Sequence, residues 1–246
     1  MTTASRIEWT QQTWNPTVGC TKISPGCKNC YAETMARRLQ AMGTAGYENG
    51  FALTLLPERL RDPIARKKPT TYFVNSMSDL FHERVSDAYI AQVFETIRAT
   101  PQHTYQVLTK RASRMARFFA RRHVPSNAWL GVSVEDVKYG TPRIDCLRRI
   151  AASVRFLSVE PLLEDIGELD LSGIHWVIVG GESGPKARPM QPAWVESIRN
   201  QCEEQSVAFF FKQWGGWGAD GRRRPKSMNG RLLNGRTWDA MPTASL

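Results

Sequence analysis

The sequence contains little histidine and few cysteines, and the cysteines are unevenly placed. Five of the 246 residues are cysteine, and three of these, Cys20, Cys27 and Cys30, fall in one short stretch. An odd number of cysteines with three clustered argues against a disulfide scaffold and favours a reducing, cytoplasmic setting. No histidine lies near the cluster in the sequence. The four histidines are His82, His103, His123 and His175.

Long apolar runs are also missing. No stretch approaches the roughly 18 apolar residues that a membrane-spanning helix needs. The opening residues MTTASRIEWT lack the basic start and apolar core of a secretory signal, so we expect none. Hydrophobic residues make up 41% of the chain and charged residues 23%, values that are ordinary for a globular protein. We therefore expect a cytoplasmic protein without membrane contact.

Acidic residues are in the minority. The chain has 23 Asp and Glu against 33 Lys and Arg, a net charge of +10. This balance favours polyanionic partners, nucleic acid first, although a solvated basic surface is an alternative. Four arginines recur at helical spacing, so they would form a stripe along one face of a single helix, which suits a phosphate backbone. They are Arg111, Arg114, Arg117 and Arg121.

The cysteine stretch, residues 14–32, reads WNPTVGCTKISPGCKNCYA and spaces its thiols as C-x6-C-x2-C. Prolines and glycines break the segment, so its thiolates can converge from a loop onto one metal centre. Soft sulfur ligands select zinc, copper(I) or an iron–sulfur cluster. A closed zinc site normally needs four protein ligands, and Cys146 and Cys202 are isolated in helix-like stretches. An iron–sulfur cluster with one open iron is therefore favoured. Zinc completed by a distant ligand, and cysteines that bind nothing, are the alternatives.

Strand-like runs alternate with helical segments along most of the chain, which predicts an α/β fold. The order predicts a parallel sheet with right-handed crossovers, either open or curled into a barrel. The strand-like runs are 72–74, 104–108, 128–134, 154–159, 175–179 and 207–211, and the clearest helical segments are 31–42, 86–99, 143–152 and 192–205. We expect one α/β domain over 1–214, with the cysteine loop 14–32 inside it. Residues 215–246, which contain Gly, Arg and Trp, would form a tail packed on this domain or extending from it.

Nearly every strand-like run ends in a short polar cluster: NSMSD, TK, SVE, SVEP, GGES and KQWG. In parallel α/β folds the functional site lies at the carboxyl ends of the strands, so these clusters would form one rim. Polar turns alone could explain the polarity, but the repeated Glu and Lys favour a site, because these residues are costly to bury unless paired. Gly180 and Gly181 would form a turn that lets a ligand approach closely, with Glu182 as a polar contact. Lys212 and Trp214 are candidate contacts to nucleic acid, because Trp can stack on bases while basic side chains grip phosphate. Trp packed over the end of a barrel is the alternative.

The arrangement of three loop cysteines, a helix and parallel strands with polar ends resembles the radical S-adenosylmethionine proteins. The usual spacing there is C-x3-C-x2-C, and the aromatic residue that often precedes the third cysteine is here Tyr31, just after it. Over nearly the whole chain, WNPTVGCTKISPGCKNCYAE, FVNSMSDLFHE, VLTKR, VSVE, FLSVEPLLE, WVIVGGESG and FFFKQWG are similar to the phage Gp37/Gp68 family. Several of these segments also resemble the spore photoproduct lyase branch of the radical enzymes.

The resemblance implies a partial (β/α)6-like barrel, a [4Fe–4S] cluster on Cys20, Cys27 and Cys30, and S-adenosylmethionine at the open iron. It also implies roles for strand-end residues. Those that would contact the amino or carboxylate groups of the cofactor are Asn75, Ser76 and Asp79. Those that would face its ribose or methionine part, or the substrate, are Lys110, Ser133, Glu135 and Glu160.

Together these observations predict an iron–sulfur enzyme of the radical S-adenosylmethionine type that repairs or modifies nucleic acid, DNA rather than RNA. A reductant for the cluster would be a second partner. Two alternatives stay open from the sequence: a metal-stabilised nucleic-acid-binding protein without turnover, and an iron–sulfur redox protein in DNA repair. The sequence singles out no catalytic residue and no oligomeric state.

Overall fold

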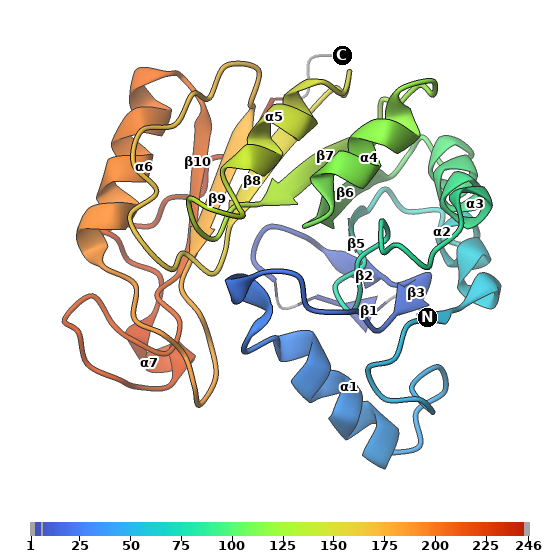
Figure 1. Ribbon diagram of the computed structural model, residues 1–246, viewed down its shortest axis with the longest axis horizontal. Helices are drawn as coiled ribbons and strands as arrows, with labels where there is room; N and C mark the ends of the chain where they lie inside the picture. The colour runs from blue at the N-terminus through green and yellow to red at the C-terminus, as the bar shows by residue number, and fades with distance from the viewer. Residues whose placement is uncertain (1–2, 6, 244–246) are drawn as a thin grey trace. The chain divides into compact units, whose positions relative to one another are not determined.

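The computed structural model describes residues 3–5 and 7–243, and its chain divides into two compact units (Figure 1). The first unit comprises Met1–Ile23, Cys30–Leu130 and Ile150–Ser153, and the second comprises Ser24–Asn29, Gly131–Arg149 and Val154–Leu246. The predicted domain ranges 1–214 and 215–246 stay predictions, and their residues 1–2, 6 and 244–246 lie outside the described residues. No helix in the described part of the chain is both long and apolar enough to cross a membrane.

The strands of the first unit are mostly parallel. Strand β2 (Gln12–Trp14) pairs in parallel with β5 (Thr71–Val74), which pairs in parallel with β6 (Thr104–Thr109). The two-residue strand β1 (Thr3–Ala4) is antiparallel to β2. Neighbouring β5 and β6 bury Tyr72 and Tyr105, whose rings stack with centroids 5.3 Å apart. This stacking lies in the core that fixes the register of the two strands.

Helices of the first unit follow the expected apolar spacing. Helix α3 (Asp87–Arg98) begins after Ser86, whose hydroxyl accepts a hydrogen bond from the backbone N–H of Tyr89, a typical N-cap. Its buried face includes Ile90 and Val93. Helix α1 (Tyr31–Ala41) begins directly after Cys30. A small antiparallel pair, β3 (Thr17–Val18) and β4 (Thr54–Leu55), and the turn elements η2 (Pro57–Arg61) and α2 (Asp62–Ala65) complete this unit.

The predicted arginine stripe on one helix is wrong in its extent. Helix α4 spans Ala112–Phe119, so Arg111 is its non-helical N-cap and Arg121 lies beyond its end. Arg111 has ψ near 54°, outside the helical region, because its side chain turns back toward Asp79 and Glu83. The stripe therefore reduces to two helical arginines, of which only Arg117 is exposed.

The second unit contains a run of three parallel strands. Strand β8 (Arg155–Val159) pairs with β9 (Trp176–Gly180), and β9 with β10 (Ala208–Gln213). All five residues of β9 are buried, which explains its unbroken apolar sequence. Strand β7 (Ala128–Ser133) is divided, with its last three residues in this unit.

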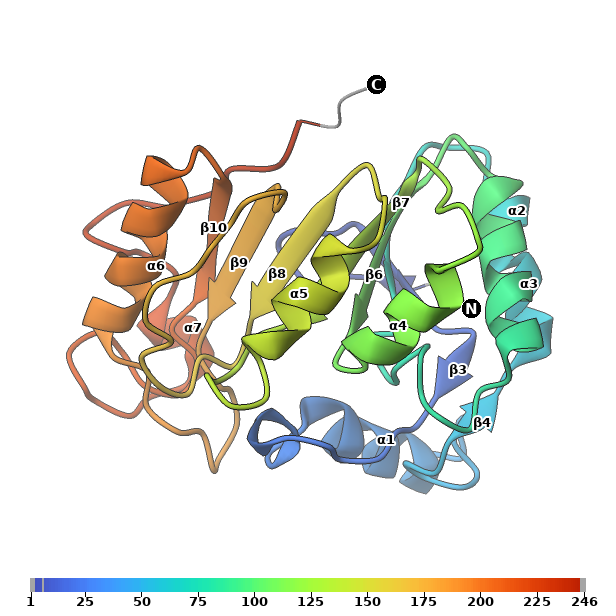
Figure 2. The same ribbon diagram turned by 45° about the horizontal axis from the view of Figure 1, so that its top comes forward.

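Helices α5 (Pro142–Arg148) and α6 (Pro192–Glu204) of the second unit lie beside these strands (Figure 2). Helix α5 contacts β8, and α6 contacts β10. After β10 the chain forms the short helix α7 (Lys226–Asn229) and then returns to β10. There Asp239 forms an antiparallel bridge with Phe210 of the strand. Trp214 is 3% exposed, and its indole N–H donates to the carbonyl of Leu232 at 2.8 Å. This indole therefore packs inside the unit, as the packing alternative expected.

Candidate functional site

Polar side chains follow the carboxyl ends of the parallel strands in each unit, as the sequence predicted. They occur after β5 and at the end of β6 in the first unit, and after β7, β8, β9 and within β10 in the second. Six carboxylate or amide side chains among them are nearly buried: Asn75, Asp79, Glu135, Asp136, Glu182 and Gln213. Because buried polar groups need partners, the contacts of these residues indicate what each strand end does.

In the first unit, Arg111 connects Cys20 to two carboxylates. Its Nη1 lies 3.5 Å from the sulfur of Cys20 and 3.1 Å from Oδ2 of Asp79, and its Nε lies 2.9 Å from Oε2 of Glu83. The arginine side chain is only 8% exposed. Burial opposes its charge, but Asp79 and Cys20 raise the pKa of Arg111 above its usual value. A fixed cation thus lies beside the thiol, an arrangement that favours the thiolate, which is the metal-binding form.

Asp79 joins the loop after β5 to the end of β6. Its Oδ1 accepts from the hydroxyl of Thr109 at 2.7 Å and from the backbone N–H of Phe81 at 2.9 Å. Its Oδ2 accepts from the backbone N–H of Lys110 at 3.1 Å as well as from Arg111. With these four contacts, Asp79 holds both the Lys110 turn and the arginine that faces Cys20.

Asn75 and Ser76 lie in the turn that follows β5. Asn75 has a left-handed backbone, with φ of 66°, and its amide nitrogen donates to the hydroxyls of Thr17 and Ser78. Its Oδ1 is buried and has no hydrogen-bond partner among the described residues. The hydroxyl of Ser76 contacts Asn15 at 3.2 Å, and its carbonyl accepts from the hydroxyl of Tyr31. The turn is therefore tied to both flanks of the cysteine stretch and retains one buried acceptor.

The fold also brings a histidine next to the cysteine stretch, although none is near in the sequence. Nε2 of the fully buried His82 lies 2.9 Å from the hydroxyl of Thr21, the residue after Cys20. Its Nδ1 accepts from the backbone N–H of Arg84, which assigns the ring proton to Nε2. Burial first, and then the charge of Arg111, lower the pKa of His82. We infer a neutral imidazole that fixes Thr21.

In the second unit, Glu135 holds the turn that carries Cys27. Glu135 has no exposed surface, and its Oε2 lies 2.6 Å from Nη1 of Arg143, which also donates to the carbonyl of Ser133 at 2.7 Å. The hydroxyl of Ser24 donates to Glu135 and lies 3.7 Å from the sulfur of Cys27. Cys27 itself closes the short turn η1 (Pro25–Cys27).

The glycine of that turn lies against the same carboxylate. A Cβ on Gly26 would lie 2.8 Å from the side chain of Glu135, so only glycine lets the turn approach so closely. The carboxylate therefore positions the segment from one side.

Glu182 holds the same segment from another strand end. Its Oε1 lies 2.6 Å from Nη2 of Arg188, while Oε2 accepts from Nε of Arg188 at 2.9 Å and from the amide of Asn29 at 3.0 Å. Arg188 also donates to the carbonyl of Pro25 at 3.1 Å. Burial raises the pKa of Glu182, but the hydrogen bonds from Arg188 and Asn29 outweigh it and hold the pKa below its usual value. Two strand ends, those of β7 and β9, therefore position residues 24–29.

Glu160, Lys212 and Gln213 form a third cluster in this unit. Nζ of Lys212 lies 2.8 Å from both carboxylate oxygens of Glu160, and the two side chains are 13% and 20% exposed respectively. Gln213 donates to the carbonyl of Gly181 at 3.1 Å and to the hydroxyl of Ser183 at 3.2 Å. In this structure Lys212 thus neutralises a carboxylate, and its predicted contact to nucleic acid stays a prediction.

The two glycines after β9 make room for the chain itself. A Cβ on Gly181 would lie 2.0 Å from the carbonyl oxygen of Trp214, and a Cβ on Gly180 would lie 3.3 Å from the carboxyl carbon of Glu160. The close approach that we predicted for a ligand at Gly181 is therefore made by backbone of the same unit.

Three thiols in the cysteine stretch have the chemistry to bind a metal. Cys20, Cys27 and Cys30 are partly exposed thiols outside any disulfide bond, whereas burial first, and then Glu203, raise the pKa of Cys202 to about 12. Cys20 and Cys30 belong to the first unit and Cys27 to the second. Within the described ranges 3–5 and 7–243, no three metal-ligating side chains are grouped as a metal site. The three thiols still supply the sulfur ligands that an iron–sulfur cluster needs, and the cation at Cys20 favours its thiolate. The buried acceptor on Asn75 suits the amino group of an amino-acid-like cofactor.

Sequence reasoning missed the partners of these strand-end residues. Arg143 and Arg188 neutralise the two buried glutamates Glu135 and Glu182. Asn29 donates a further hydrogen bond to Glu182, and Thr109 donates one to Asp79. A buried glutamate requires a cation, but the chain has 33 basic residues and no local signal selects among them. Of the predicted arginines, Arg114 donates to the backbone carbonyls of His82 and Val85, while Arg117 and Arg121 are exposed.

Comparison with known proteins places the chain in a family and identifies its fold. The family described as "Protein of unknown function (DUF5131)" matches residues 4–242. No curated protein matches the sequence. A solved mutant of spore photoproduct lyase with dinucleoside spore photoproduct superposes with a TM-score of 0.51 at 12% identity, covering 83% of this chain and 64% of that chain. Another mutant of that lyase gives 0.50 at 12% identity with the same coverage.

The structural similarity confirms the predicted α/β fold with parallel strands. This chain spans about 64% of the length of the lyase. The (β/α)6-like barrel form and the phage Gp37/Gp68 assignment stay predictions.

Proposed function

The chain belongs to the DUF5131 family of proteins of unknown function, and we propose that it is a [4Fe–4S] protein of the radical S-adenosylmethionine type that acts on nucleic acid. The observation that carries the proposal is the attachment of the cysteine stretch to strand ends. Arg111 contacts Cys20. Glu135 and Glu182 accept hydrogen bonds from Ser24 and Asn29, which flank Cys27. The fold is shared with a lyase of the radical type, which agrees with this assignment.

The side chains of the proposed site would have three different roles: cluster ligation, charge compensation and cofactor binding. Cys20, Cys27 and Cys30 would hold the cluster, which together with S-adenosylmethionine would supply a radical that removes hydrogen from the substrate. Arg111 would offset the negative charge of the Cys20 thiolate. Oδ1 of Asn75, which has no hydrogen-bond partner in the described part of the chain, would accept from an amino group of the cofactor.

The remaining strand-end residues would position this site. Asp79 would keep Arg111 and the Lys110 turn in place, and Ser76 would hold the turn after β5. Ser133, through its carbonyl, keeps Arg143 on Glu135. Pre-organisation of this kind lowers the cost of orienting reactants in radical and polar reactions alike.

The proposed substrate class rests on charge and on the fold. The chain carries a net charge of +10, and the lyase of similar fold was solved with dinucleoside spore photoproduct, a DNA lesion fragment. Exposed Arg117 and Arg121 can contact phosphate without breaking a described ion pair. DNA is therefore the proposed substrate, and the proposed reaction is repair or modification, with an external one-electron reductant for the cluster.

Metal and sulfide analysis of anaerobically purified protein tests the proposal. We expect about four iron atoms and four acid-labile sulfides per chain, lost in Cys27→Ala and kept in the matched control Cys146→Ala, whose thiol lies outside the stretch. With dithionite as reductant, the wild type should convert S-adenosylmethionine to 5′-deoxyadenosine and methionine. Zinc in place of iron, or iron without cofactor cleavage, would refute the radical assignment.

A further inference from the structure

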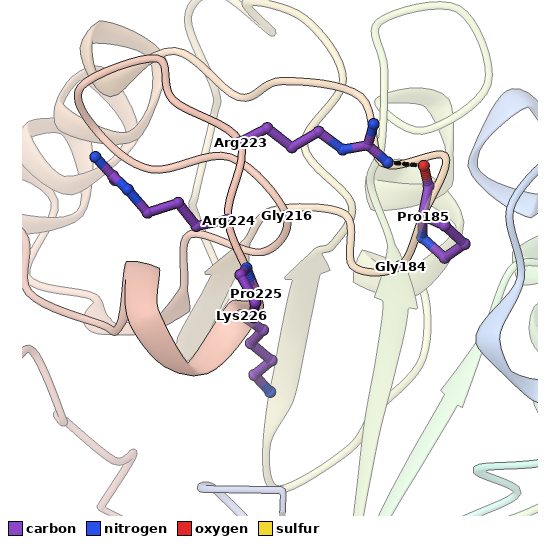
Figure 3. A pocket seen from close by; sticks show the side chains of 7 residues that line it. All are labelled: Gly184, Pro185, Gly216, Arg223, Arg224, Pro225 and Lys226. Carbon is purple, nitrogen blue, oxygen red and sulfur yellow. Dashed lines mark hydrogen bonds between the residues drawn. The ribbon is translucent and has the colours of Figure 1, made fainter.

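A basic cavity in the second unit is lined by residues to which no role was assigned above. It has a volume of about 420 Å³ and is formed by the loop after β9 and the segment that leads into α7 (Figure 3). Three cationic side chains line it, Arg223, Arg224 and Lys226, together with glycine and proline residues. No acidic residue is among its lining residues. A cavity with this lining attracts an anion.

The walls of this cavity are fixed by hydrogen bonds. Residues 216–218 and 222–224 pair as a narrow hairpin, with the N–H of Arg224 donating to the carbonyl of Gly216 at 3.1 Å. The indole of Trp217 donates to the carbonyl of Ala187 at 2.7 Å, which pins the hairpin to the loop after β9. The amide of Asn229 donates to the carbonyl of Gly215 at 3.0 Å, which fixes the start of the hairpin. The cavity is therefore part of the folded unit.

The cations of the cavity differ in how far they are neutralised. Arg224 is paired with Asp220, with Nη1 3.0 Å from Oδ1. Arg223 is exposed and reaches across to the carbonyl of Pro185, as the dashed line in Figure 3 shows. A carbonyl accepts one of its five N–H donors without neutralising its charge. The cavity thus keeps a net positive charge and free guanidinium donors.

We propose that this cavity binds a phosphate group of a nucleic-acid strand, held by Arg223 and Lys226. This inference rests on the nucleic-acid substrate of the proposed function. A planar guanidinium and an ammonium are the usual phosphate ligands, Arg through paired N–H donors and Lys as a point charge. The volume exceeds that of a single phosphate, so the sugar next to the phosphate has room as well. A free nucleotide offers the same phosphate chemistry, and the experiment below separates the two sources.

Oligonucleotide binding by fluorescence anisotropy tests the site. The double variant Arg223→Gln, Lys226→Gln removes two charges from the cavity. The control Arg149→Gln, Lys68→Gln removes two exposed charges that precede the amino ends of β8 and β5. We expect the cavity variant to bind a labelled single strand about tenfold or more weakly at about 100 mM salt, and its salt slope to fall by about 0.7, the contribution of one phosphate contact.

Two comparisons keep this test decisive. The charge-preserving variant Arg223→Lys, Lys226→Arg should restore most of the affinity, which separates charge loss from misfolding. An equal loss in the cavity variant and its control would overturn the inference, because it would show general electrostatics. Loss of ATP binding with unchanged oligonucleotide binding would also overturn it and would assign the cavity to a free nucleotide.

The proposed function and this inference can fail separately. Iron, sulfide and cleavage of S-adenosylmethionine without DNA should be the same in the cavity variant as in the wild type. If the wild type lacks the cluster but the cavity variant binds the oligonucleotide more weakly than the wild type, the radical assignment is refuted and the phosphate site is supported. If the wild type cleaves S-adenosylmethionine but the wild type and the cavity variant bind the oligonucleotide equally, the radical assignment is supported and the phosphate site is refuted.

Discussion

Replacing Arg143 with methionine tests whether the buried carboxylate of Glu135 organises the turn around Cys27. The substitution keeps an unbranched side chain and removes its charge, so the fully buried Glu135 loses a partner at 2.6 Å. It also leaves the carbonyl of Ser133 without the donor at 2.7 Å. The carboxylate then keeps the hydroxyl of Ser24 as its described hydrogen-bond partner.

The expected loss of stability follows from these contacts. Breaking a buried ion pair by removing one partner costs about 3–5 kcal/mol, because the remaining buried charge loses its hydrogen-bonded counter-ion. With an m-value of about 3 kcal/mol/M in urea, the unfolding midpoint should fall by roughly 1–1.7 M. The double variant Glu135→Gln, Arg143→Met removes the stranded charge while keeping an acceptor for Ser24. It should be more stable than Arg143→Met alone by about 2 kcal/mol.

Urea unfolding and thiol labelling measure the two consequences separately. The unfolding midpoints of the wild type, both single variants and the double variant complete a double-mutant cycle. Alkylation of Cys27, followed by mass spectrometry, reports on the turn, and it should be faster in Arg143→Met than in the wild type, with Cys146 as the internal reference. Additive losses in the cycle, or a loss below about 1 kcal/mol for Arg143→Met, would refute the argument.

Two further predictions concern charge. In Arg111→Gln, loss of the cation 3.5 Å from Cys20 should lower the thiolate fraction and slow alkylation of Cys20 about tenfold at neutral pH relative to Cys30; an unchanged or faster rate would contradict this. Burial, and then the charge of Arg155, lower the pKa of His175. The unfolded state therefore binds its proton first as pH falls through about 6.5, so stability should decrease from pH 7.5 to 5.5. His175→Gln should reduce that decrease in urea unfolding, and an identical pH dependence would rule out this contribution.

Local features of the fold could be predicted from the sequence because their signals are local. The apolar run before Thr109 predicted β6, and Ser86 followed by apolar residues at helical spacing predicted α3 within one residue at each end. Polar residues at the strand ends could be predicted for the same reason, since each follows its strand directly in the chain. By contrast, β2 contains Gln12 and Thr13 and has only three residues, and pairing with β1 and β5 makes it a strand.

The partners within the site depend on contacts between distant residues, which local patterns do not encode. Helical spacing placed Arg111 in a stripe suited to a phosphate backbone, yet its side chain pairs with buried Asp79 and contacts Cys20. Likewise, 61 positions separate Thr21 from the histidine that contacts it, His82. Charge and burial decide these pairings, and both become visible only when the strands are in place.

Backbone contacts of the chain with itself explain the glycines after β9 and β10. A Cβ on Gly181 would lie 2.0 Å from a backbone oxygen, and a Cβ on Gly215 would lie 2.3 Å from the carbonyl oxygen of Glu182. Gly215 also has φ of 82°. Each position is closed to every side chain, so a scan of all substitutions should find glycine alone tolerated at both. If both glycines are invariant in related sequences, the cause would be the close packing of these two backbone segments. Their invariance would be no evidence for a bound ligand.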